Sequence, residues 1–149
     1  KFRFCGMSNN SDLILKDIRV KRFEFEINES VPFEEGQTIN ISITPRPKIS
    51  SANIHEGVLE LEVSLFNKDY QVKNDPFYLD IIVQGIFEDE GEGEVDLVNK
   101  YLPNMLSMLY SYIRTYISSV TGMFGMQSIN IPTINVFKLL ESNFSNGDN

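Results

Sequence analysis

Residues 101–126 read YLPNMLSMLYSYIRTYISSVTGMFGM, and this stretch decides how the C-terminal third of the chain folds. Apolar side chains recur in it at three- and four-residue spacing, which predicts one buried face of a long helix. That face consists of Leu102, Leu106, Leu109, Ile113, Tyr116, Ile117 and Val120. Pro103 suits the first position of a helix, where its missing N–H is not needed. We therefore expect a short helical turn over residues 95–102, the long helix from Pro103 onward, and its end at Gly122.

A second apolar stripe lies beside the first on the same helix. It consists of Tyr101, Met105, Met108, Tyr112 and, less regularly, Tyr110. Only a narrow strip of serine, threonine and arginine remains polar, so the helix is apolar around most of its girth. A single sheet can cover only one side of such a helix. The sequence therefore predicts an oligomer, in which further copies of the chain cover the rest.

An apolar linker and a second helix are expected after the long helix. Glycines flank the large side chains of the linker, which are Met123, Phe124 and Met126. Methionine adapts to irregular surfaces because its side chain is flexible and polarizable. Pro132 ends the extended run that follows, and a shorter helix is expected from Thr133 to about Ser142, capped by Thr133 or Asn135. Its apolar side chains are Val136, Phe137, Leu139 and Leu140.

Three stretches upstream alternate apolar and polar residues, which is the pattern of strands with one buried face. They are residues 13–28, 38–44 and 59–65, and residues 77–87 predict a fourth strand. Pro45 and Pro47 cannot continue a ladder of hydrogen bonds, so we expect the second strand to end before them. The fourth strand is apolar on both faces, which places it in the centre of a sandwich or in an interface. Strands followed by helices predict an α+β fold.

Composition limits the chain to one domain and to certain partners. With 149 residues, of which 42% are hydrophobic, the chain can build one core. A net charge of −8 argues against nucleic acid as a partner and favours basic or unfolded polypeptides. No apolar run approaches the roughly 20 residues of a membrane helix, and the single cysteine, Cys5, allows no internal disulfide, so we expect a cytoplasmic protein. The domain is expected over residues 13–144, between an N-terminal extension, 1–12, and a disordered tail, 145–149.

The sequence offers no catalytic, metal or cofactor site. His55 is the only histidine and has Glu56 beside it, but no nucleophile can be assigned to the pair. Cys5 with one histidine cannot form a zinc site, and the glycines at 85, 91 and 93 fit no phosphate-binding fingerprint. The acidic segment 88–94 lacks the ligand alternation of a calcium-binding loop, so we interpret it as a solvated, mobile loop. We expect a protein that is not an enzyme and needs no cofactor.

Three motifs in the last third of the chain resemble those of the SecB family of bacterial export chaperones. Residues 102–104, Leu-Pro-Asn, are similar to the motif that opens the family's long helix, and residues 112–114 are similar to its Tyr-x-Arg. Residues 131–136, Ile-Pro-Thr-Ile-Asn-Val, resemble the Leu-x-Pro-x-Asn-Phe motif before the last helix, with valine in place of the phenylalanine. Three additional residues separate the first motif from the second. The resemblance covers about residues 14–144.

The resemblance implies a four-stranded antiparallel sheet, one long and one short helix, and a homotetramer built as a dimer of dimers. It implies ATP-independent holding of unfolded polypeptide clients in apolar grooves between the sheet, the linker and the helices. Some members of the family serve export through the SecA motor, and others protect the antitoxin of a toxin–antitoxin pair. A SecA-like motor or an antitoxin is therefore an implied partner. The alternative is a dedicated adaptor for one partner, such as an antitoxin-binding module without general chaperone activity.

Two sets of side chains are candidates for these contacts. Flexible and aromatic side chains suit a protein that binds many sequences weakly. The client-binding candidates are Met105, Met108, Tyr112, Met123, Phe124 and Met126 on the helix and linker, with Tyr78, Ile82 and Ile86 on the sheet side of the groove. An ordinary core or subunit interface is the alternative for each. The acidic strand faces either dock a basic partner, such as the tail of a motor protein, or are plain solvated surface. Their residues are Glu24, Glu26, Glu60 and Glu62.

Overall fold

The computed structural model describes residues 13–34, 36–91 and 93–145. Its elements are β1 (Leu13–Ile27), β2 (Ile41–Ile49), β3 (Glu56–Leu65), β4 (Phe77–Asp89), α1 (Leu97–Met123) and α2 (Val136–Ser145). The predicted α+β fold, a four-stranded antiparallel sheet followed by one long and one short helix, is confirmed. The predicted extension 1–12, with Cys5, and residues 146–149 of the predicted tail lie outside the described residues. None of the described helices is long and apolar enough to cross a membrane.

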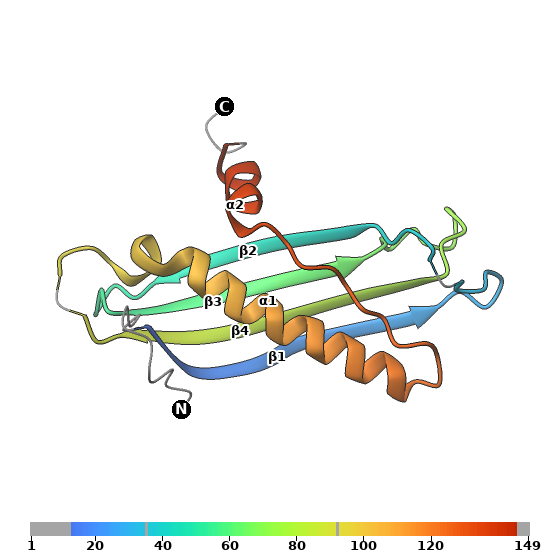
Figure 1. The fold of residues 1–149 in the computed structure, drawn as a ribbon, viewed down its shortest axis with the longest axis horizontal. Coiled ribbons are helices and arrows are strands. Elements are labelled where there is room, and N and C mark those ends of the chain that lie inside the picture. The colour runs from blue at the N-terminus through green and yellow to red at the C-terminus, as the bar shows by residue number, and fades with distance from the viewer. Residues whose placement is uncertain (1–12, 35, 92, 146–149) are drawn as a thin grey trace.

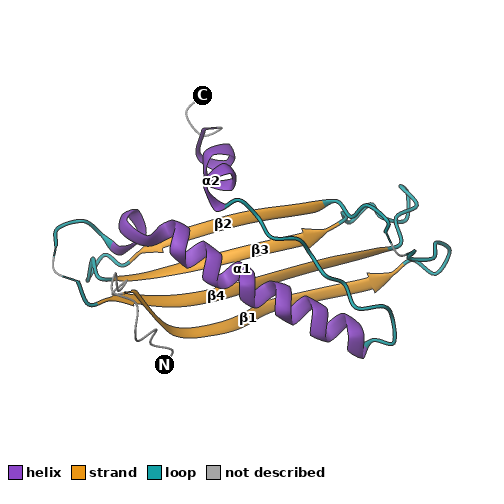
Figure 2. Ribbon diagram, viewed as in Figure 1, coloured by secondary structure: helices purple, strands orange, loops and turns teal. Residues whose placement is uncertain are grey.

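The strands lie in the order β1-β4-β3-β2, and every neighbouring pair is antiparallel. Helix α1 crosses one face of this sheet diagonally, and the linker after it returns across the same face (Figure 1). The last helix, α2, lies beyond the β2 edge of the sheet (Figure 2). The apolar pattern on both faces of β4 thus belongs to a central strand of a single sheet, since the described residues form no second sheet to complete a sandwich.

Gly85 shows which face of the sheet α1 covers. A Cβ atom built on Gly85 would lie 2.7 Å from Leu109 Cδ2, so the helix passes closer to the strand here than a larger residue allows. Successive side chains of a strand point to opposite faces, and paired residues of neighbouring strands share a face. Gly85 and the other odd-numbered residues of β4 therefore face α1, on what we call the inner face. The even-numbered residues of β4 lie on the outer face.

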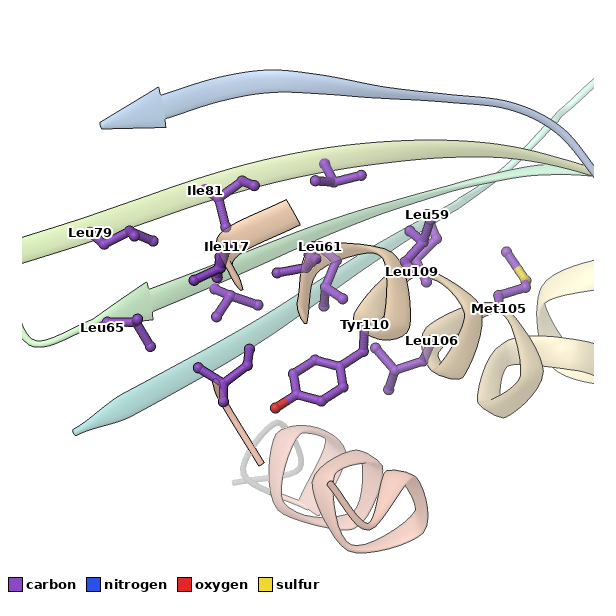
Figure 3. Packing of buried hydrophobic residues seen from close by; sticks show 14 of the residues in the cluster. Leu59, Leu61, Leu65, Leu79, Ile81, Met105, Leu106, Leu109, Tyr110 and Ile117 are labelled. Carbon is purple, nitrogen blue, oxygen red and sulfur yellow. The ribbon is translucent and has the colours of Figure 1, made fainter. Parts of the chain in front are cut away.

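The core fills the space between the inner face and α1. Leu59 and Leu61 of β3 and Leu109 of α1 meet there (Figure 3). The fully buried apolar side chains of the described residues are Leu59, Leu61, Val63, Leu65, Phe77, Leu79, Ile81, Val83, Phe87, Leu97, Met105, Leu106, Leu109, Ile113 and Ile117. The predicted core stripe of the helix is therefore buried at its centre, whereas Leu102, Tyr116 and Val120 at its margins are half-buried.

Two boundaries that we based on prolines are wrong. Strand β2 continues through Pro45 and Pro47, which pair with Leu61 and Leu59. This is possible because β2 is an edge strand, where a residue without an N–H can face the open edge. Helix α1 begins at Leu97, so Pro103 lies inside it and not at its first position. The side chain of Asp96 caps the helix by accepting the Asn99 N–H at 3.0 Å, and burial of the first helical residue in the core favours this earlier start.

The linker is fixed to α1 by side chains of the helix. The Tyr110 hydroxyl donates to the Pro132 carbonyl at 2.5 Å, and Arg114 Nε donates to the Ile131 carbonyl at 3.0 Å. Burial raises the pKa of Tyr110 above its ordinary value, which keeps the phenol protonated as a donor. The arginine of the 112–114 motif therefore has a structural role. The Asn135 side chain accepts a hydrogen bond from the Lys138 N–H at 3.1 Å, which identifies Asn135 as the cap of α2. The helix begins at Val136, three residues after the expected start at Thr133.

Candidate functional site

An aromatic surface lies where the C-terminal half of α1 meets β1. Phe23 and Phe25 project from the inner face of β1, since they pair with Ile81 and Leu79 of β4. The ring of Tyr116 on α1 meets the ring of Phe23 edge-on, with centroids 5.6 Å apart. We call Phe23, Phe25 and Tyr116 the aromatic cradle. Tyr112, one helical turn earlier, stacks beside Tyr116 at 6.4 Å, so the aromatic surface continues along α1.

Phe124 fills the cradle. Its ring stacks on Phe25 with centroids 5.0 Å apart and an interplanar angle of 24°, and it lies 6.2 Å from Phe23. Phe124 is the C-cap residue of α1, and its N–H donates to the Thr121 carbonyl. Gly125 follows with φ at +78°, a left-handed conformation that commonly ends a helix. The Phe124 side chain nevertheless remains 46% exposed, so the cradle holds it only in part.

Two hollows open beside the turn after β1, and Phe124 lines the larger of them. The larger, of about 710 Å³, is lined by Phe25, Phe124 and the turn after β1. The smaller, of about 330 Å³, is lined by Phe33, Phe77 and Met126 among others. The charged residues that line the two hollows are Glu26 and Glu29. The site thus combines aromatic walls, one flexible methionine and an acidic margin, which suits apolar side chains of a polypeptide better than a small anionic ligand.

The structure places the helix and linker candidates in different environments. Met105 has no exposed surface and belongs to the core. Met108 and Met126 are partly buried against the core, and Tyr112 is 37% exposed on the aromatic surface. Met123 is 83% exposed and lies next to Phe124 in the chain. Tyr112, Phe124 and Met126 therefore border one continuous surface, whereas Met105 lies beneath α1.

The sheet candidates Tyr78, Ile82 and Ile86 lie on the outer face, across the sheet from α1 and the linker. Their register fixes this, because Ile82 and Ile86 alternate with inner-face residues of β4. Tyr78 is buried there, with its ring stacked at 6.2 Å on that of Tyr70. The two sets of client-binding candidates therefore do not line one groove within a single chain.

The four glutamates proposed for docking also lie on the outer face, and three of them have cationic partners there. Arg46 Nε lies 2.8 Å from Glu60, and its Nη1 lies 3.0 Å from Glu62. Lys21 Nζ lies 2.6 Å from the Glu60 carboxylate. The hydrogen bond from Lys21 is the largest cause, and that from Arg46 the next, of a pKa of Glu60 below its ordinary value. Arg22 pairs with Glu24. This part of the outer face is a network of mixed charges and not a free acidic surface.

A buried carboxyl group lies beside this network. The Asp80 side chain accepts a hydrogen bond from Ser64 Oγ at 2.6 Å, and Asp80 is 1% exposed. Burial is the main cause that raises the pKa of Asp80 above its ordinary value, and the neighbouring Glu62 raises it further. The outer face therefore holds a carboxyl group that resists ionisation.

A polar cluster lies at the opposite end of α1. Lys100 Nζ lies 3.5 Å and His55 Nδ1 3.8 Å from the same oxygen of Asp89, whose side chain is 1% exposed. Asp89 also accepts the Gly91 N–H at 2.7 Å. Asp89 is thus a buried part of β4 that joins the sheet to α1, and the predicted solvated loop 88–94 was wrong at this position. Over the described ranges, no three metal-binding side chains come together.

The residues of the cradle were not among the candidates from the sequence. The alternation of β1 assigned Phe23 and Phe25 to an ordinary buried face, and helical spacing assigned Tyr116 to the core stripe. All three are only half-buried in the structure, because β1 is an edge strand at the margin of α1. The available signal was the pair of phenylalanines two positions apart in β1, since large aromatic residues contribute most of the contact energy of binding surfaces.

A four-stranded antiparallel sheet covered on one face by a long helix, with a second helix after an extended linker, defines the chain as a protein of the SecB-like fold. A solved structure that supports this assignment is that of the Rv1957 SecB-like chaperone of Mycobacterium tuberculosis, in complex with a ChAD peptide from the Rv1956 HigA1 antitoxin. The similarity has a TM-score of 0.65 at 21% identity, and it covers 82% of this chain and 90% of that one. The predicted resemblance is confirmed at the level of the fold.

Two further proteins are similar to this chain, one in structure and one in sequence. A protein of unknown function from Streptococcus agalactiae has a TM-score of 0.50 at 11% identity, over 81% of this chain and 97% of that one. The uncharacterized protein MJ0357 of Methanocaldococcus jannaschii is 27% identical over 118 residues, which are 78% of this chain and 75% of that protein. None of the known protein-family models matches the chain.

Proposed function

We propose that this protein is an ATP-independent holding chaperone that binds unfolded segments of polypeptide on the aromatic surface around Phe124. The observation that carries the proposal is the half-exposed run of rings from Tyr112 through Tyr116 and Phe23 to Phe124 and Phe25. Aromatic rings offer large apolar contact area with few rotatable bonds, so they bind many apolar sequences without a shaped pocket. Met123 and Met126 add flexible apolar surface at the margin.

The solved relative supports the proposed class of client. The Rv1957 protein is described as a SecB-like chaperone and is bound to a peptide of an antitoxin. By analogy, an antitoxin segment is the first client that we propose for this chain, in the cytoplasm and without a catalytic step. Transfer of clients to a SecA-like motor for export is the second use, and the glutamates of the outer face, Glu24, Glu26, Glu60 and Glu62, are its proposed docking residues. A basic partner would have to replace the present partners of three of them.

Exposed aromatic side chains on both helices support the further proposal of a homotetramer built as a dimer of dimers. Tyr112 is 37% exposed on α1, and Phe137 is 69% exposed on α2. Exposed aromatic side chains on two helices are typical of surfaces that another subunit covers. In the tetramer, Tyr78, Ile82 and Ile86 of the outer face form a second client-contact region, separate from the aromatic surface of the same chain.

A dedicated adaptor for one antitoxin is the second candidate function, and the peptide complex of the relative favours it specifically. The two functions differ in breadth. A holding chaperone keeps several unrelated unfolded proteins soluble at near-stoichiometric amounts, whereas an adaptor recognises one sequence. Both use the aromatic surface, so a substitution in the cradle alone does not separate them.

Light scattering coupled to size-exclusion chromatography tests the proposal. The chain is run alone and with reduced, carboxymethylated α-lactalbumin, a client that stays unfolded. We expect a species of about 68 kDa, four times the 17.1 kDa chain, which gains mass when the client is present. Suppression of aggregation of two unrelated heat-denatured proteins then supports the chaperone, whereas suppression of neither supports the adaptor. A monomer that gains no mass contradicts both the holding function and the tetramer.

A further inference from the structure

We propose that Asp80 loses its proton when a basic partner docks on the outer face, so that docking and proton release are coupled. The inference rests on the proposed docking function of the outer-face glutamates and adds a regulation to it. An ammonium or guanidinium group of the partner takes the place of Arg22 at Glu24. The released Arg22 pairs with the Asp80 carboxylate, and the proton of Asp80 passes to the solvent.

Asp80 lies between charged neighbours on the outer face. In the register of the sheet, it lies directly opposite Glu24 of β1 and opposite Ser64 of β3. Arg22 and Glu62 lie one row further along, and both pair with the same residue of β4. Diagonal neighbours of antiparallel strands are about 7–8 Å apart, which is within reach of a long side chain. Arg22 can therefore reach Asp80 without a change in the backbone.

The carboxyl groups of this region outnumber the arginines that neutralise them. Arg22 pairs with Glu24, and Arg46 Nη1 lies 3.0 Å from Glu62. Among the residues that the structure describes, no cation forms an ion pair with Asp80, which accepts a hydrogen bond from the neutral Ser64 hydroxyl at 2.6 Å. The two arginines thus serve the two glutamates, and the third carboxyl group of the region has no cation of its own.

Asp80 also holds its proton more firmly than an exposed aspartate does. Burial is the largest cause of its raised pKa, and the hydrogen bond with Glu62 and the charge of Glu62 raise the pKa further. The Ser64 hydrogen bond and the charge of Arg22 lower the pKa. Closer approach of Arg22 therefore lowers the pKa of Asp80 again and drives the proton off.

The remaining groups near Asp80 supply no positive charge. The pKa of Tyr78 is raised, by burial first and by the charge of Asp80 next, so this phenol stays neutral. Tyr70, from the turn before β4, stacks on Tyr78, and burial is the first cause of its raised pKa as well. Of the described helices, α1 covers the inner face and α2 lies beyond the β2 edge, so neither adds a charge here (Figure 2). A cation for Asp80 must therefore come from Arg22.

A partner can reach Glu24 from the solvent but cannot reach Asp80. The side chains of Arg22 and Glu24 are 48% and 40% exposed, whereas Asp80 is buried. Exposed ion pairs are held weakly, so a cation of the partner competes with Arg22 for Glu24. After the exchange Glu24 has the partner's cation and Asp80 has Arg22, so each carboxylate is paired.

The coupling determines how docking depends on pH. Above the pKa of Asp80 in the folded protein, the carboxyl group is already ionised, and docking releases no proton from it. Below that pKa the proton must leave, so the affinity falls as the pH falls, by about tenfold per pH unit for one full proton. Exposed glutamates protonate near about pH 4.3, so measurements above about pH 5 separate Asp80 from them.

The test uses a peptide of nine residues with alternating lysine and serine, blocked at both ends. It carries no group that titrates between about pH 5 and 7.5, because lysine protonates near about pH 10. Calorimetry at low ionic strength gives its affinity, and two buffers of different ionisation enthalpy give the number of protons released. His55 titrates in the same range, but it is present in every variant, so its contribution cancels in the comparison.

Four variants separate the steps of the exchange. Asp80→Asn keeps an acceptor for the Ser64 hydroxyl but has no proton to lose, and Arg22→Met removes the cation that moves. Glu24→Gln removes the carboxylate that the partner takes and therefore locates the docking site. Arg19→Met is the matched control, since Arg19 is an arginine of the same face whose Nε donates to the neutral Gln84 side chain at 2.9 Å.

We expect the unchanged protein and Arg19→Met to release more protons, and to bind more weakly, as the pH is lowered from about 7.5 to 5. Asp80→Asn should bind with nearly the same affinity throughout this range, and Arg22→Met should release fewer protons than the unchanged protein. Equal proton release from the unchanged protein and Asp80→Asn overturns the inference, while binding that Glu24→Gln weakens leaves the docking function standing. Absence of binding, or binding that Glu24→Gln does not weaken, overturns both.

Discussion

Met105 and Met123 provide the sharpest comparison between a buried and an exposed methionine in this chain. Met105 has no exposed surface and packs in the core between α1 and the sheet, whereas Met123, at the end of the same helix, is 83% exposed. Truncation of a fully buried methionine to alanine removes apolar contact and leaves a cavity, which together destabilise a protein by about 2–5 kcal/mol. Truncation of an exposed one usually changes stability by less than about 0.5 kcal/mol.

We therefore predict that Met105→Ala lowers the free energy of unfolding by about 3 kcal/mol and that Met123→Ala leaves it nearly unchanged. In a chain of this size, 1 kcal/mol shifts the midpoint temperature by roughly 2–4 °C, so the two variants should differ by roughly 6–12 °C. Unfolding in urea, followed by circular dichroism, measures the difference in free energy of unfolding between the two variants. Both are measured at the same protein concentration, because the stability of an oligomer depends on concentration. A loss below about 1 kcal/mol for Met105→Ala would refute its assignment to the core and return it to the client-binding candidates.

Three further substitutions test separate parts of the structure. Tyr110→Phe removes the hydrogen bond to the Pro132 carbonyl and keeps the shape of the ring. We expect this change to lower the free energy of unfolding by about 0.5–1.5 kcal/mol. Hydrogen exchange should also show faster exchange of the amides of Asn130 and Ile131. Asp80→Asn should raise the urea midpoint at neutral pH, because burial raises the pKa of Asp80 in the folded state and the ionised carboxyl therefore destabilises the fold. The gain in stability should vanish as the pH falls below about 4, where the carboxyl is protonated in the unfolded chain as well. A gain that persists in acid would contradict this reasoning. Arg46→Met should cost less than about 1 kcal/mol because the Arg46 side chain is 39% exposed, and the loss should shrink in 1 M salt; a salt-independent loss would point to packing instead.

The order and type of the elements could be predicted because their signals are local. Alternation in β1 and β3, the apolar run of β4, and three- and four-residue spacing in α1 depend only on residues close in sequence. The boundaries at prolines could not be predicted in the same way. Whether Pro45 ends a strand depends on its position at the edge of the sheet, and whether Pro103 starts a helix depends on the cap at Asp96 and on how deeply the preceding turn is buried. Those are properties of the tertiary structure, which overrides local preference.

The candidate site shows the same division more clearly. The sequence singled out Phe124 because of its glycine neighbours, and the structure places it in contact with Phe25, which lies about a hundred positions away in the chain. The local sequence pattern around either residue does not predict this contact. It arises because β1 is an edge strand, so the diagonal path of α1 leaves the inner face of Phe23 and Phe25 only half covered, and the end of the helix brings Phe124 to the gap. In a fully covered sheet the same phenylalanines would be ordinary core. Their exposure at the margin leaves a half-covered aromatic surface beside the end of α1, which is the surface that we propose for client binding.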